Sequence, residues 1–95
     1  MGNNAASRKN WRPRYLDGTE LQRRIDAAGM TQAALAAAAE VDPGHVSHWV
    51  AGHYGPDLKV ITRVAAALPE CDPADLMHED GKTRYAELRE ALSAA

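Results

Sequence analysis

Several features that define other classes of protein are missing from this chain of 95 residues. Its single cysteine, Cys71, excludes an internal disulfide and is typical of proteins in a reducing compartment. No apolar run approaches the roughly 20 residues that a helix needs to span a bilayer, and the opening sequence MGNNAASRKN has no apolar signal region. We therefore expect a cytoplasmic protein that has no contact with a membrane.

Signatures of catalysis and of cofactor binding are also missing. The length allows one small domain but no separate catalytic domain, and there is no glycine-rich loop that would hold a phosphate. His45 and His48 lie three residues apart with His53 nearby, a spacing that a metal can use, yet no cysteine or carboxylate is placed to complete a site. Ser47 and His48 are neighbours in the chain and would not face each other on a helix. We expect no enzymatic activity, no metal, no cofactor and no small-molecule ligand.

Charge is divided unevenly along the chain. The first 16 residues contain four basic residues and no acidic residue, whereas the remainder contains seven basic and thirteen acidic residues. The two parts carry +4 and −6, which sum to the formal net charge of −2. We predict that residues 1–15 form a basic, flexible arm, residues 16–79 a folded domain, and residues 80–95 an amphipathic helix.

Two helices joined by a short turn are predicted near the middle of the chain. Thr31 and Asp42 have side chains that cap the amides at a helix start, and Pro43 suits the first position of the second helix. The first helix must end before Asp42, so about three residues remain to turn the chain into helix 43–51, and the two helices must cross at a steep angle. Ala36 then lies where the axes approach, because a larger side chain would push them apart. An unspecific alanine-rich helix is the alternative interpretation.

Similar start signals and apolar periodicity predict the other helices. Asp17 and Glu20 form an aspartate version of the capping box for a first helix, about 18–28, which stops near Gly29. Further helices are predicted at about 57–68, from Asp72-Pro73 and over the C-terminal sequence KTRYAELREALSAA. Cys71 precedes the short helix and is predicted to be a small core residue. The fold class is therefore all-α, a compact bundle of five to six short helices.

The pattern across these helices resembles the lambda-repressor-like helix-turn-helix family, which includes phage repressors, Cro proteins and many small bacterial transcription regulators. The resemblance covers about residues 20–77 and rests on Gly29-Met30-Thr31-Gln32, Leu35-Ala36, Val41, Val46-Ser47, Gly52, Pro56 and Val64-Ala65-Ala67-Leu68. Glu40 stands in the turn where the family usually has glycine, so the turn either holds a left-handed non-glycine residue or adopts another geometry. Val50 replaces a frequent glutamate, so apolar packing with Trp49 would take the place of an ion pair.

The resemblance implies that helix 43–51 enters the major groove of DNA and reads its bases. Val46 and Val50 are expected to point inward with Trp49 at the boundary, which leaves a face without carboxylates towards solvent or DNA. Predicted base contacts are Pro43, Gly44 and His48, which match the family's base-contacting positions, and the adjacent His45 and Ser47. Predicted phosphate contacts are Gln32, at a helix N-terminus, together with His53, Tyr54, Lys59, Arg63 and the arm residues Arg8, Lys9, Arg12 and Arg14. For the arm, Lys59 and Arg63, a solvated surface without function is the alternative.

The C-terminal segment carries an apolar stripe of Tyr85, Leu88 and Leu92 that must be buried. It either folds back on the domain or pairs with a second copy, and we predict a homodimer because linked half-sites increase affinity. The resemblance implies a sequence-specific DNA-binding transcriptional regulator, a repressor or a Cro-like phage switch protein, whose partners are an operator in double-stranded DNA and a second copy of the chain. The alternative is a helix-turn-helix module that binds protein, such as an antitoxin or an anti-repressor.

Overall fold

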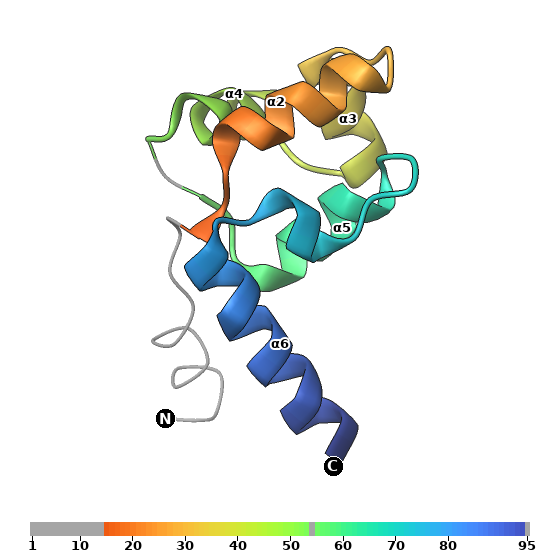
Figure 1. Cartoon of the computed structure of the whole chain (residues 1–95). Coiled ribbons are helices and arrows are strands. Elements are labelled where there is room, and N and C mark those ends of the chain that lie inside the picture. The colour runs from red at the N-terminus through yellow and green to blue at the C-terminus, as the bar shows by residue number, and fades with distance from the viewer. Residues whose placement is uncertain (1–14, 54, 95) are drawn as a thin grey trace.

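The computed structural model of the protein describes residues 15–53 and 55–94, except for the side chains of residues 92–94. Within these ranges the fold is all-α, as predicted, and its one pairing of extended residues is an isolated bridge. The helices, of which Figure 1 labels the α-helices, are α2 (Gly18–Ala27), α3 (Gln32–Ala39), α4 (Pro43–Ala51), α5 (Leu58–Ala66), the 3₁₀ helix η2 (Pro73–Leu76) and α6 (Glu79–Ala94). None of these helices is both long enough and apolar enough to cross a bilayer.

Four of the helices begin at a side chain that caps a backbone amide. The acceptor and donor pairs are Asp17 Oδ1 with Glu20 N (3.1 Å), Thr31 Oγ1 with Ala34 N (3.0 Å), Asp42 Oδ1 with Gly44 N (2.7 Å) and Asp57 Oδ1 with Val60 N (3.0 Å). The caps predicted at Asp17, Thr31 and Asp42 are confirmed. Each cap satisfies an amide that has no partner inside its helix, so the helix starts are determined by a few neighbouring residues.

The capping box predicted at the start of α2 is only half formed. The Glu20 carboxylate accepts hydrogen bonds from Arg23 and Arg24, and the Asp17 amide instead donates to the Leu76 carbonyl at 2.8 Å. The prediction that Glu20 would reach back to Asp17 is therefore wrong. A tertiary bond takes its place because the bridge between Leu16 and Met77 brings the two segments together.

Three residues connect α3 to α4, as predicted. Glu40 has φ 61° and ψ 46°, so the turn adopts the left-handed alternative. Val41 N donates to Ala36 O at 2.9 Å, which closes the end of α3. Arg63 of α5 donates from Nε to Ala39 O (3.1 Å) and from Nη2 to Glu40 O (2.9 Å). These bonds satisfy carbonyls at the C-terminus of α3 and attach α5 to the turn.

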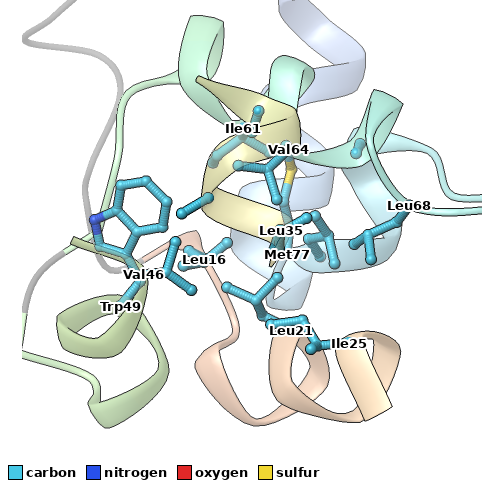
Figure 2. Packing of buried hydrophobic residues seen from close by; sticks show 14 of the residues in the cluster. Leu16, Leu21, Ile25, Leu35, Val46, Trp49, Ile61, Val64, Leu68 and Met77 are labelled. Atoms are coloured by element: carbon cyan, nitrogen blue, oxygen red, sulfur yellow. The ribbon is translucent and has the colours of Figure 1, made fainter. Parts of the chain in front are cut away.

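The core lies between α2, α3, α4, α5 and η2, and Figure 2 shows Trp49 at one end of the cluster and Leu68 at the other. Ala36 is fully buried where α3 packs on α4, as predicted from its small size. On α4, Val46 is also fully buried, but Trp49 is only 4% exposed whereas Val50 is half-buried. The expectation that Val50 points inward with Trp49 at the boundary is wrong. The helix turns the face of residues 46 and 49 towards the core, which buries the larger apolar ring.

The C-terminal part of the chain packs on the core through η2. Leu76 is fully buried, whereas Cys71 is half-buried and packs against the edge of the core cluster, so the predicted core position of Cys71 is confirmed only in part. The start of α6 packs closely, because a Cβ added at Gly81 would come within 2.7 Å of Tyr15 Cβ. The C-terminal part of α6 extends away from the other helices (Figure 1). Tyr85 and Leu88 are half-buried against the edge of the core cluster, and the side chain of Leu92 lies outside the described residues.

Candidate nucleic-acid interface

The exposed face of α4 is defined by the residues that hold the helix on the core. Val46 and Trp49 are buried and Val50 is half-buried against the core, so the other six positions of the helix face outward. The exposed residues are Pro43, Gly44, His45, Ser47, His48 and Ala51, and their predicted exposure is confirmed. This face contains hydroxyl and imidazole groups, which donate and accept hydrogen bonds, and it contains no carboxylate. We refer to these six residues as the α4 face.

Both ends of α4 are held by local bonds. Asp42 caps the start, where Pro43 occupies the first helical turn and needs no hydrogen bond for its nitrogen. At the other end Gly52 has φ 82°, the left-handed conformation that ends many helices, and His53 N donates to His48 O at 3.1 Å. The α4 face is therefore carried by a short helix with both ends closed, which limits fraying.

The three histidines near α4 fall into two arrangements. The ring of His45 stacks on Trp49, with ring centroids 6.1 Å apart and planes inclined by 28°. The ring of His48 lies beside that of His53, with 3.2 Å between their Nδ1 atoms. His53, predicted as a phosphate contact, thus lies next to a predicted base contact, because the left-handed Gly52 reverses the chain.

Gln32 lies at the N-terminus of α3 in a hydrogen-bonded chain that sequence reasoning missed. Gln32 Nε2 donates to Gln22 Oε1 at 2.7 Å, and Gln22 Nε2 donates to Asp26 Oδ1 at 2.8 Å. A carboxylate only accepts hydrogen bonds, so Asp26 requires the side-chain NH₂ group of Gln22 to face it. The side-chain oxygen of Gln22 then faces Gln32 and orients the amide of Gln32. The contact between residues 22 and 26 could be predicted from their i, i+4 spacing in the sequence. The link to residue 32 depends on how α2 packs beside α3.

Gln32 and Arg63, both predicted to contact phosphate, are not brought together. Arg63 binds the carbonyls of Ala39 and Glu40 at the C-terminus of α3, whereas Gln32 is the first residue of that helix. The eight residues of α3 separate the two ends by about 12 Å. Lys59 is exposed in the first turn of α5, one helical turn before Arg63. The guanidinium of Arg63 therefore has a structural role at the turn that the sequence prediction did not include.

The comparison with known proteins decides the family. The model of a family described as helix-turn-helix matches residues 21–76, which is more than half of the chain. The chain belongs to the helix-turn-helix family. It is a lambda-repressor-like helix-turn-helix protein of the Cro and C1 type, and the matched segment contains most of α2 and all of α3, α4, α5 and η2. No curated protein sequence and no solved structure matches the chain.

Membership of this family bears on what the chain does. The helix-turn-helix family is a family of DNA-binding domains and not of enzymes, and it supports a role for this helix-turn-helix protein in DNA-binding regulation. In the two described ranges, no three histidine, cysteine, aspartate or glutamate side chains lie together in a group that could hold a metal ion. The α4 face is therefore interpreted as a surface for binding DNA.

Several predicted phosphate contacts of this helix-turn-helix protein lie outside the described residues. They are Arg8, Lys9, Arg12, Arg14 and Tyr54. The residues after position 14 carry seven basic and thirteen acidic side chains, a net charge of −6. Because phosphate neutralisation requires cations near DNA, the absence of carboxylates from the α4 face matters for a domain with this charge. Asp42, the cap of α4, is the acidic residue that directly precedes that face.

Proposed function

We propose that this protein is a sequence-specific transcriptional regulator that inserts α4 into the major groove of an operator and acts as a repressor. The observation that supports this most directly is the α4 face. It is exposed, it carries no charge when its histidines are neutral, and it lies on a helix whose two ends are capped. A rigid helix with small residues near its start approaches the floor of the major groove closely and positions hydrogen-bonding groups with little loss of entropy.

In this proposal, different residues of the α4 face make different contacts with the bases. His48 donates to a guanine acceptor, and His45 and Ser47 contact neighbouring base edges. Pro43 and Gly44 have little side-chain bulk, so the start of α4 approaches the groove floor closely. The amides at the N-terminus of α3 and the oriented side chain of Gln32 bind a phosphate and thereby set the depth of α4.

The proposal includes a homodimer on a two-fold operator, like the switch proteins of phages. Two copies would place their α4 helices in successive major grooves one helical turn apart. The pairing surface in this proposal is the apolar stripe of Tyr85, Leu88 and Leu92 on α6. Residues 1–15 form the basic arm, residues 16–79 the DNA-binding domain and residues 80–95 the pairing helix. Lys59, His53 and the arm cations complete the phosphate contacts.

Fluorescence anisotropy tests the proposal with a duplex from the region upstream of the protein's own gene and a scrambled duplex of the same composition. We expect tight binding to the first duplex, with log K falling against log salt by a slope of about −4 to −5 if roughly five phosphates are neutralised. His48→Ala should reduce the preference for the upstream duplex. His78→Ala, which changes an exposed histidine outside α4, is the matched control.

Two results would contradict the proposal. Equal and weak binding to both duplexes, unchanged by His48→Ala, would favour the protein-interaction module, such as an antitoxin or anti-repressor, and would direct the search to protein partners. Selective binding that His48→Ala and His78→Ala weaken equally would show that α4 does not read the operator. Circular dichroism of each variant verifies that the helices remain folded.

A further inference from the structure

The pair of His48 and His53 has a geometry that DNA contacts alone do not require. Their Nδ1 atoms are 3.2 Å apart, their ring centroids are 5.4 Å apart, and both residues are exposed. The backbone holds the pair in place, because Gly52 is left-handed and His53 N donates to His48 O at 3.1 Å. Two imidazole nitrogens are thus held near each other by the closed end of α4.

We propose that His48 and His53 form a two-ligand site for a divalent transition-metal ion of the group Zn²⁺, Ni²⁺ and Cu²⁺. When each Nδ1 binds the ion at about 2.0–2.1 Å, the separation of 3.2 Å corresponds to an N–metal–N angle of about 100°. This angle is close to that of a tetrahedral site. Imidazole nitrogens favour these ions, whereas Mg²⁺ and Ca²⁺ prefer oxygen ligands.

In this proposal, water or an anion fills the remaining coordination positions. No further histidine, cysteine or carboxylate joins this pair to make a group of three in residues 15–53 and 55–94. His45, on the same helix, has its ring stacked on Trp49. A structural zinc site is closed by four protein ligands, so this two-ligand site is a surface site that water or an anion completes. Folding does not depend on it.

Metal binding changes the hydrogen-bonding character of the α4 face. In the metal-free pair, a hydrogen bond between the two Nδ1 atoms requires one of the rings to carry its proton there. A metal bound to both Nδ1 atoms places the proton of each neutral ring on Nε2, so His48 becomes an Nε2 donor suited to guanine. The ion also adds positive charge beside the phosphates. The metal therefore strengthens DNA binding, a consequence that depends on the proposed function.

The metal site is tested first without DNA, on protein that carries no histidine tag. Zn²⁺ is titrated by calorimetry, and Ni²⁺ is titrated while the histidine ring signals are followed by NMR. We expect one ion per chain and selective broadening of the His48 and His53 signals by paramagnetic Ni²⁺. His53→Gln should weaken Zn²⁺ binding by about tenfold or more, since even outer-shell changes cost that much at metal sites. His78→Gln changes an exposed histidine that is not part of this pair and should leave Zn²⁺ binding unchanged.

These titrations distinguish a failure of the proposed metal site from a failure of the proposed DNA binding. Absence of Zn²⁺ binding, or Zn²⁺ binding of equal strength in wild type and His53→Gln, overturns the site whether or not the protein binds DNA. For the coupling, the anisotropy titration is repeated with Zn²⁺ and with excess EDTA. Zn²⁺ should tighten binding to the upstream duplex in wild type and have no effect in His53→Gln. Equal tightening in both proteins overturns the coupling.

Discussion

Gly18, the first residue of α2, lies directly against the carbonyl of Val50 in the last turn of α4. A Cβ added at Gly18 would come within 2.7 Å of the Val50 oxygen, a distance that requires the backbone to move. The start of α2 therefore fixes the position of the C-terminal end of α4. Since α4 carries the candidate DNA-reading face, a residue far from that face in the sequence sets how it is presented.

Gly18→Ala is expected to destabilise the protein by about 1–3 kcal/mol, as overpacking does in cores. Helix propensity alone would favour alanine by up to about 1 kcal/mol, so the two effects have opposite signs. Gly44→Ala is the matched control, because its Cβ would meet only the exposed carboxylate Asp42 Oδ1, at 3.1 Å. Urea denaturation measures both variants. A Gly18→Ala protein as stable as wild type would show that α2 and α4 separate without cost.

Gln22→Ala is expected to weaken DNA binding through Gln32. The bond of 2.7 Å from Gln32 Nε2 orients the side chain that we propose to contact phosphate. If Gln22 acts only by positioning Gln32, then Gln22→Ala should reduce affinity no further when it is added to Gln32→Ala. Anisotropy of the two single variants and the double variant measures this coupling. Fully additive losses would argue for an independent role of Gln22.

Arg63→Ala is expected to lower the free energy of unfolding by about 1–2 kcal/mol, because its charged hydrogen bonds to Ala39 O and Glu40 O are lost. The salt dependence of DNA binding should stay the same if this structural role is the main one. Lys59→Ala, one turn earlier on the same helix, should instead reduce the slope of log K for DNA binding against log salt by about 1, without loss of stability. A reduced slope for Arg63→Ala with unchanged stability would restore the original phosphate-contact prediction.

Glu40→Gly is expected to stabilise the protein by about 0.5–1 kcal/mol. The left-handed φ of 61° costs a residue with a Cβ about 1–2 kcal/mol, which exceeds the added unfolded-state entropy of glycine. Glu40→Ala keeps the Cβ and should give no such gain. Thermal unfolding compares the three proteins. A rise in the midpoint for Glu40→Ala equal to that for Glu40→Gly would point to the glutamate charge rather than to backbone strain.

The stability contributed by Glu20 is expected to disappear in acid. Hydrogen bonds from Arg23 and Arg24 lower the pKa of this carboxyl from 4.5 to about 2. A carboxyl whose pKa is lowered by folding stabilises the protein above its unfolded-state pKa and loses this effect as pH falls towards the folded-state pKa. Glu20→Gln should thus be less stable than wild type at pH 7, with the difference shrinking between about pH 4.5 and pH 2. A difference that does not depend on pH would exclude this linkage.

Short-range features account for what was predicted correctly about the candidate site. Thr31 and Asp42 mark helix starts through hydrogen bonds that reach only two or three residues along the chain, and Pro43 suits the first helical position because its φ is fixed. The exposed positions of the α4 face follow from the helical period once one buried residue, Val46, is identified. For Val50 the same reasoning failed, because a helix can rotate by part of a turn on its core and the period alone does not choose between adjacent positions.

The sequence by itself determined the helices, three of the four side-chain caps, the three-residue turn and the family, because these depend on residues close together in the chain and on their pattern. Only the tertiary structure decided that Arg63 closes the end of α3, that Gln22 orients Gln32, and that Trp49 is more deeply buried than Val50. These relationships arise where separate helices meet. Such contacts depend on the angle and rotation of each helix on the shared core, which many side chains set together.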